Sequence, residues 1–142
     1  GKGILPHSVT FTTDLHSMGQ YIQDGERIIM ETVLKVNNSS NHVNIPYDEA
    51  DGDGLNYLQQ KTLTEINHCA SEGTAIAHVD GGVPVTTIEM ERINEEIIGQ
   101  LFYMMEYACG VSGYILKVNP FDQPGVEAYK RNMFHLLGKK GY

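Results

Sequence analysis

The sequence has few cysteines, few basic residues and no long hydrophobic run, and each shortage excludes a class of protein. The two cysteines, Cys69 and Cys109, are too few for a disulfide framework or a cysteine-rich zinc site. Both lie in apolar periodic runs, so we expect buried free thiols in a reducing compartment. No apolar run reaches the length of about 18 residues that a membrane-spanning helix needs. Membrane-spanning and disulfide-rich proteins are therefore excluded.

Basic residues are outnumbered by acidic ones, 10 to 18, which gives a net charge of −8. The excess is larger in the first nine-tenths of the chain, because several basic residues follow the last acidic residue, Glu127. These basic residues are Lys130, Arg131, Lys139 and Lys140. Nucleic acids and anionic membranes attract basic surfaces, so we expect neither as a partner.

The remaining composition is ordinary for a globular protein. Apolar residues make up 41% of the 142 residues and charged residues 20%, which is enough for one domain with a real core. The first residues lack the apolar core of a signal peptide, so we expect a cytoplasmic protein. The sequence does not begin with Met, and we therefore expect a processed chain or a piece of a longer one.

Strand-like and helical segments alternate along the chain. We predict strands at 8–13, 27–36 and 83–90, and helices at 13–25, 55–80, 94–117 and 124–137. The second strand is nearly continuously apolar, which is typical of a strand buried on both faces. This order predicts an α/β fold with a mostly parallel sheet in a three-layer α/β/α arrangement. Three strands make a thin sheet, so we expect a partial domain.

Lys130 lies in the middle of the apolar stripe of the last helix. At helical spacing it falls between Phe134 and Leu137, on the face that also carries Val126 and Met133. One reading is a lysine whose stem covers apolar surface and whose charge reaches water. The other reading is a partly desolvated cation that faces an anionic or hydroxylated ligand.

His16 lies in the first turn of a predicted helix that directly follows a predicted strand. Ligands of open α/β sheets bind at the carboxyl ends of strands, where this arrangement would place the imidazole. A helix N-terminus disfavours imidazolium, so His16 could stay neutral and still exchange a proton. The alternative is a histidine that only caps or packs against the helix.

No segment has the spacing of a metal site. The acidic loop Glu49-x-Asp51-x-Asp53-Gly54 approaches a calcium-binding loop, but Gln60 stands where a bidentate carboxylate is needed. His68, Cys69 and His78 point in different directions on one predicted helix. We expect neither a metal nor another cofactor.

Four segments resemble a known family. Residues 11–25, 53–62, 77–84 and 119–141 resemble, nearly end to end, the C-terminal part of bacterial glucose-6-phosphate isomerases, the phosphoglucose isomerase family. The match is specific, because TDLHSMGQ resembles the family's histidine segment and NPFDQPGVEAYK its C-terminal signature. Family members are much longer. The resemblance therefore implies that residues 1–142 form a C-terminal fragment of a sugar isomerase domain, without the N-terminal domain and the catalytic glutamate.

The resemblance also implies an activity and a role for three residues. The family interconverts glucose 6-phosphate and fructose 6-phosphate, a step of glycolysis and gluconeogenesis, without metal or cofactor. His16 corresponds to the histidine that protonates the ring oxygen, and Lys130 to the lysine at the ring-opening end of the sugar. Gln123 corresponds to a glutamine near the substrate phosphate, at a helix start suited to an anion; a simple capping role is its alternative. Family members are homodimers, so we also expect a second copy of the chain as a partner.

Two non-enzymatic functions are alternatives to the isomerase hypothesis. The chain could belong to a sugar-phosphate-binding regulatory domain, or it could be a dimerisation segment with no ligand of its own. His16 and Lys130 argue against a purely regulatory domain, because such a domain needs ligand contacts but no proton shuttle.

Overall fold

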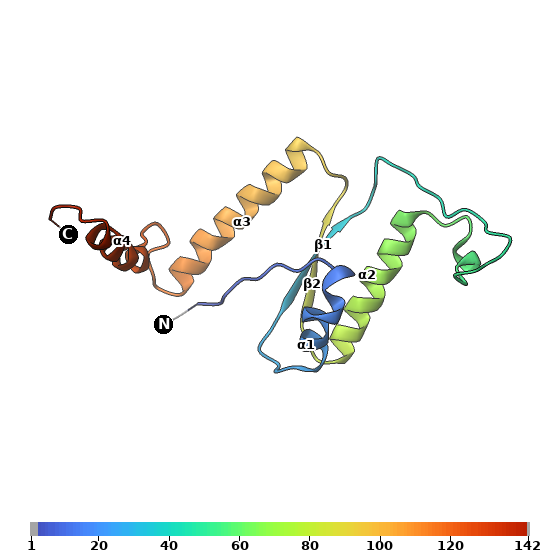
Figure 1. Ribbon diagram of the computed structural model, residues 1–142, viewed down its shortest axis with the longest axis horizontal. Coiled ribbons are helices and arrows are strands. Elements are labelled where there is room, and N and C mark those ends of the chain that lie inside the picture. The colour runs from blue at the N-terminus through green and yellow to red at the C-terminus, as the bar shows by residue number, and fades with distance from the viewer. Residues whose placement is uncertain (1–2, 142) are drawn as a thin grey trace. The chain divides into compact units, whose positions relative to one another are not determined.

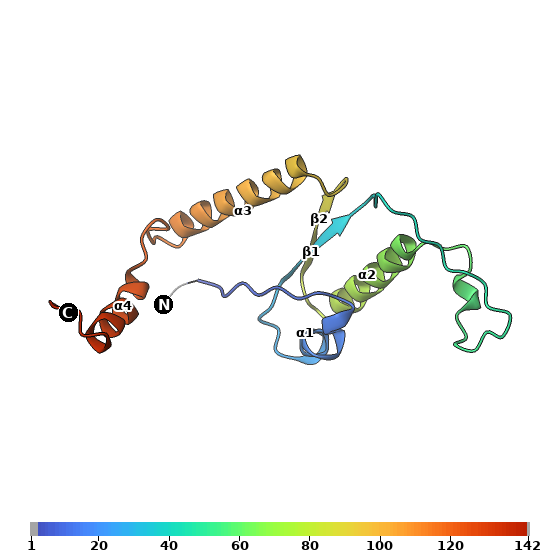
Figure 2. The ribbon, with the colours of Figure 1, turned by 45° about the horizontal axis from the view of Figure 1, so that its top comes forward.

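The computed structural model describes residues 3–141, which divide into two compact units. The core unit is Pro6–Ile97, and the C-terminal unit is 98–141 together with 3–5. Figures 1 and 2 show the helices and strands of both units from two directions. Each unit is described by itself below.

The core unit is built around two parallel strands. β1 (Glu31–Val36) and β2 (Val85–Met90) pair along their whole length, with Glu31 opposite Val85 and Val36 opposite Met90. α2 (Leu63–Asp80) connects them and lies beside the sheet in both views (Figures 1 and 2). Parallel neighbours need such a crossover. The predicted α/β class and parallel pairing are confirmed.

α2 begins at a capping box. The Thr62 hydroxyl accepts a hydrogen bond from the Glu65 backbone N–H over 3.1 Å. The Glu65 carboxylate accepts in return from the backbone N–H of Thr62 over 2.6 Å. The bond from the Thr62 backbone N–H, and next a bond of 2.9 Å in which the Thr62 hydroxyl donates to the same carboxylate, lower the pKa of Glu65. The box uses two N–H groups that a helix start otherwise leaves unpaired.

Thr62→Ala should lower the free energy of unfolding by about 1 kcal/mol, because the hydroxyl acceptor is lost. Thr62→Ser keeps the hydroxyl and is the matched control, expected within a few tenths of a kcal/mol of wild type. The pKa of Glu65 is lower in the folded state than in the unfolded state, so the ionised carboxylate stabilises the fold. This stabilisation is complete at pH values above the ordinary carboxyl pKa. It is lost as the pH falls through the lowered pKa. Urea unfolding of both variants measures the difference; equal midpoints would contradict this role of the cap.

One predicted strand is absent and two predicted elements start later than expected, and each difference has a local cause. Residues 8–13 form no strand in the described chain, because Thr10 uses both backbone groups in bonds to Asp14 instead of to a strand. The sheet therefore has two strands instead of the predicted three. The helix expected from residue 55 starts later, since Gln60 adopts a left-handed φ of 68°. β1 starts at Glu31 because the segment before it turns back toward α1 (Met18–Asp24), where Arg27 donates to the Ile22 carbonyl.

The core is small. Among the described residues, the buried apolar side chains are Ile22, Val83 and Met90. β1 alternates between half-buried and exposed side chains, so the expectation of a strand buried on both faces is wrong. The helices described within the core unit cover one face of the sheet, and Leu34 on β1 remains 49% exposed.

The C-terminal unit contains most of α3 (Glu95–Ile115) and all of α4 (Pro124–Leu136). Asn94 caps α3 as predicted, since its Oδ1 accepts a backbone N–H over 2.8 Å. The turn after α3 packs tightly, because a Cβ on Gly113 would lie 2.7 Å from the Cβ of Pro120. Only glycine fits there without a shift of the turn.

Both cysteines are free and exposed, so the expectation that they are buried is wrong. Cys69 lies on α2 and Cys109 on α3. No helix in residues 3–141 is long and apolar enough to cross a membrane.

Candidate active site

His16 is presented by a short, hydrogen-bonded turn. It is the last residue of the 3-10 helix η1 (Thr13–His16), and its side chain is exposed. The backbone N–H of Thr10 donates to Asp14 Oδ2 over 2.7 Å, and the backbone N–H of Asp14 donates to the Thr10 carbonyl over 2.9 Å. The Ser17 hydroxyl donates to the Asp14 carbonyl over 3.1 Å. Asp14 thus holds the turn closed on both sides of His16.

The surroundings of His16 differ from the sequence-based expectation. We predicted a place in the first turn of a helix behind a strand. Instead, α1 (Met18–Asp24) begins two residues after His16, and the segment before η1 is not a strand. His16 therefore ends a 3-10 turn and does not lie at a helix start.

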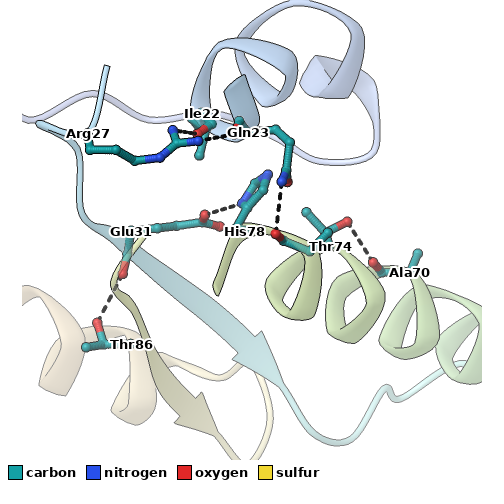
Figure 3. Close-up of polar contacts among 9 residues, drawn as sticks. Ile22, Gln23, Arg27, Glu31, Ala70, Thr74, His78 and Thr86 are labelled. Carbon is teal, nitrogen blue, oxygen red and sulfur yellow. Dashed lines mark hydrogen bonds and ion pairs between the residues drawn. The ribbon is translucent and has the colours of Figure 1, made fainter. Parts of the chain in front are cut away.

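The helix that follows His16 is fastened to the rest of the core unit. Arg27 donates from one guanidinium nitrogen to the carbonyls of Ile22 and Gly25, both over 3.0 Å, and from another to the Gln23 carbonyl. These bonds satisfy carbonyls that the end of a helix leaves free. The Gln23 side-chain amide donates to the Ala77 carbonyl of α2 over 3.0 Å (Figure 3). α1 is thereby tied to the last turn of α2.

A buried polar pair beneath this segment was missed by the sequence analysis. His78 on α2 is 2% exposed, and its Nδ1 lies 2.6 Å from Oε2 of Glu31 at the start of β1 (Figure 3). A carboxylate only accepts hydrogen bonds, so Nδ1–H is the donor. The His78 ring also meets the Phe11 ring edge-on, with centroids 6.0 Å apart. Sequence spacing shows only that His78 lies on a helix, and 47 residues separate it from Glu31.

Lys130 lies on α4 and is paired with an acidic neighbour. Its Nζ donates to Glu127 Oε1 over 2.9 Å, and 42% of its side chain is exposed. This hydrogen bond, and then the charge of Lys130, lowers the pKa of Glu127. The apolar stripe around Lys130 is only partly covered: Val126 and Phe134 are half-buried, whereas Leu137 is 74% exposed. Lys130 is a half-exposed cation within that stripe.

Gln123 is the residue before α4, but its side chain makes no capping hydrogen bond. Pro124 occupies the first helical position, where the missing N–H has least effect. The Gln123 side chain is exposed. The geometry therefore does not show Gln123 acting as a simple helix cap. Gln123 and Lys130 belong to the C-terminal unit and His16 to the core unit.

One cavity of the core unit lies away from His16. Its volume is about 710 Å³, at the carboxyl ends of both strands, where Val36, Ser39 and Arg92 contribute to its wall. A second, more open cavity of about 520 Å³ lies between α1 and α2 and includes Leu15. In residues 3–141, no three His, Cys, Asp or Glu side chains are grouped so that they could hold a metal ion.

Comparison with known proteins identifies relatives along the whole chain. The family model described as phosphoglucose isomerase matches residues 7–139. A glucose-6-phosphate isomerase of Leptospira biflexa is 63% identical over all 142 residues, which correspond to 32% of that protein. Those of Parabacteroides distasonis and Clostridioides difficile are 61% and 60% identical over 100% and 99% of the chain, covering 32% and 31% of their own lengths. The chain thus spans about a third of the curated relatives it matches.

A solved structure is also similar. The crystal structure of a hypothetical protein from Thermus thermophilus matches with a TM-score of 0.84 and 25% sequence identity. The match covers 89% of this chain and 30% of the other. The similarity in fold therefore extends over most of the chain and, as with the sequence relatives, over a minor part of the larger protein.

Proposed function

This chain belongs to the phosphoglucose isomerase family, and we propose that it acts as the C-terminal part of a glucose-6-phosphate isomerase. The observation that carries the proposal is the family match over residues 7–139, which includes His16, Gln123 and Lys130. The relatives are about three times longer, so we propose that an N-terminal domain and a glutamate base complete the site. Below, the full-length protein means a polypeptide that carries this segment at the full length of its relatives.

The proposed reaction begins with ring opening of glucose 6-phosphate. His16 donates a proton to the ring oxygen while the bond between that oxygen and C1 breaks, and the C1 hydroxyl passes its proton to a solvent water molecule to give the open-chain aldehyde. The exposed imidazole on the closed η1 turn is accessible to such a substrate. A histidine can donate and recover a proton near neutral pH, which is what a general acid for this step needs.

The isomerisation then moves a proton between carbons. The glutamate base removes the proton from C2, and a cis-enediolate forms with its negative charge on O1. The proton then returns to C1 while the O2 hydroxyl proton passes to O1, which gives fructose 6-phosphate. Lys130 supplies a positive charge that stabilises the negative charge on the sugar oxygens during ring opening and afterwards. Gln123 would donate from its free amide to the substrate phosphate, near the start of α4. No step of this scheme needs a metal or cofactor.

Lys130 must exchange its partner to act in this way. In the described chain its ammonium group is paired with Glu127, and both side chains are well exposed to water. Exposed ion pairs contribute little to stability, so a sugar hydroxyl can displace Glu127 at small cost. The pair therefore does not oppose the proposed role.

Lys130→Ala in the full-length protein should lower kcat/KM by on the order of tenfold or more and the free energy of unfolding by less than about 1 kcal/mol. Loss of a contact that strengthens in the transition state lowers the rate, whereas a half-exposed lysine adds little to folding. Glu127→Gln removes the partner but keeps the lysine, and its kcat/KM should stay within about twofold of wild type. Steady-state kinetics and urea unfolding measure both; wild-type turnover of Lys130→Ala would reduce Lys130 to a solvated surface residue.

We propose that the remainder of the polypeptide and a second copy of the chain are the protein partners. Large apolar side chains of α3 are exposed within the described residues, including Phe102 at 63% and Tyr107 at 65%. Exposed apolar surface of this extent is typical of a segment that another surface covers. A cytoplasmic location is consistent with the proposed role in glycolysis and gluconeogenesis.

The activity is tested with the full-length protein and fructose 6-phosphate. Formation of glucose 6-phosphate is followed with glucose-6-phosphate dehydrogenase, with and without a chelator of divalent cations in the isomerase step. We expect turnover that the chelator does not change. Tight binding of fructose 6-phosphate without turnover would instead support a regulatory sugar-phosphate-binding protein.

A further inference from the structure

His78 is the buried polar residue of the described core, and the proposed reaction gives it no role. Its Nδ1–H donates to Glu31 over 2.6 Å, and the side chains of the pair are 3% and 12% exposed. Burying groups of this kind is costly unless they are paired. The pair fixes the end of α2 to the start of β1 (Figure 3).

The same ring packs against the segment that leads into the His16 turn. Phe11 meets His78 edge-on at 6.0 Å, with an angle of 72° between the ring planes. Phe11 follows Thr10, whose backbone N–H and carbonyl both bond to Asp14 of η1. The position of the His78 ring therefore influences where the turn that ends in His16 begins.

The segment after His16 is attached to the same place on α2. Gln23 of α1 donates to the carbonyl of Ala77, the neighbour of His78 (Figure 3). The polypeptide that carries His16 is thus fastened before the turn to His78 and after the turn to Ala77. Glu31 holds this end of α2 against β1.

We propose that His78 and Glu31 are positioning residues for His16: the buried pair sets where the η1 turn, and with it the imidazole of His16, meets the sugar ring. This inference rests on the proposed function, in which His16 protonates the ring oxygen. A general acid works only from a narrow range of positions, and a displacement of about 1 Å can lower a rate on the order of a hundredfold. Neither His78 nor Glu31 touches the substrate.

The test compares ring opening with isomerisation in the full-length protein. One substrate is glucose 6-phosphate; the other is a tetrose 4-phosphate, which cannot close a furanose ring because O4 carries the phosphate. His78→Leu removes the hydrogen bond to Glu31. We expect kcat on glucose 6-phosphate to fall on the order of tenfold or more, while kcat on the ring-free substrate stays within about twofold of wild type. His78→Asn, whose amide can still donate to Glu31, should restore most of the loss.

His68→Leu is the matched control. His68 also joins α2 to β1, through a hydrogen bond of 2.8 Å from Nε2–H to the Val36 carbonyl, but at the other end of the strand and ten residues earlier on the helix. Its loss should weaken folding without changing the ratio of the two rates. If His78→Leu and His68→Leu change both rates by the same factors, His78 has a structural role only and the proposal is overturned.

A double variant shows whether His78 acts through His16. In a His16→Ala background, His78→Leu should cause no further loss on glucose 6-phosphate, because residues that act as a unit are not additive. Multiplicative losses would overturn the proposal. Should His78→Leu not fold, Glu31→Gln and Phe11→Leu perturb the same contacts more mildly, and both should show the selective loss.

His16→Ala, measured on both substrates, separates the positioning role of His78 from the proposed function of His16. A selective loss in His16→Ala without one in the His78, Glu31 and Phe11 variants overturns the positioning role alone. If His16→Ala itself has no selective loss, the proposed function of His16 fails, and the positioning role fails with it.

Discussion

Purified on its own, the 142-residue chain should have no measurable isomerase activity, below about a thousandth of the turnover of the full-length protein. The C2 proton of the sugar is weakly acidic, so its removal needs a positioned carboxylate. The carboxylates beside the proposed site residues do not replace that base: Asp14 accepts from Thr10, and Glu127 is an exposed surface residue of α4. Glu31 is held by buried His78.

The same preparation should self-associate or bind an apolar dye. Few apolar side chains are buried in the described residues, and large ones on α2 and α3 are exposed, among them Ile76 at 57% and Phe102 at 63%. A coupled assay with glucose-6-phosphate dehydrogenase, with the sample checked by mass for full-length contaminant, measures the activity. Turnover comparable to that of the full-length protein would show that the base lies within this chain and that the proposed division of the site is wrong.

His16→Ala in the full-length protein should slow the isomerisation of cyclic glucose 6-phosphate by a hundredfold or more, on the scale of about 10²–10⁴ that general acid catalysis contributes. The reason is that, in the proposed function, His16 serves the opening of the ring, whereas the glutamate serves proton transfer between carbons. The tetrose 4-phosphate needs no ring opening, so its turnover should fall far less.

His7→Ala is a suitable control for that variant. His7 is an exposed histidine of the same unit, outside the η1 turn, and its ring bonds only the adjacent Ser8 carbonyl among the described contacts. Its rates on both substrates should match those of wild type. Equal losses on both substrates in His16→Ala would place His16 at the carbon step or in a purely structural role.

Helical spacing and capping residues predicted much of the fold. The periodic stripes gave three of the helices their approximate places, and Asn94 caps α3 as its position before Glu95 and Glu96 indicates. The start of α2 was missed, although Thr62-x-x-Glu65 is a capping-box pattern that can be read from the sequence. The apolar periodicity continues upstream of Thr62, and it therefore predicted an earlier helix start than the capping box indicates.

The wrong predictions depend on contacts in space, which a single amino-acid sequence does not show. Residues 8–13 have strand composition, but a strand also needs a paired neighbour, and Asp14 takes the backbone groups of Thr10 instead. Burial of Cys69 was inferred from its place in an apolar run, yet its side chain is exposed in the wall of the open cavity between α1 and α2. The pairing of His78 with Glu31 joins positions far apart in the sequence, so helix periodicity could not reveal it.

The roles of His16, Gln123 and Lys130 stay predictions. The structure shows where each lies, and the family match includes all three. Of these roles, the supply of the acid that opens the sugar ring is central to the proposed function.

Exchange between the α and β anomers of glucose 6-phosphate measures that step directly, because anomers interconvert only through the open chain. Two-dimensional exchange NMR at equilibrium gives the rate with wild-type full-length protein and with His16→Ala. Our account predicts that wild type accelerates the exchange and that His16→Ala loses at least about nine-tenths of the acceleration. Exchange at the wild-type rate in His16→Ala would contradict it.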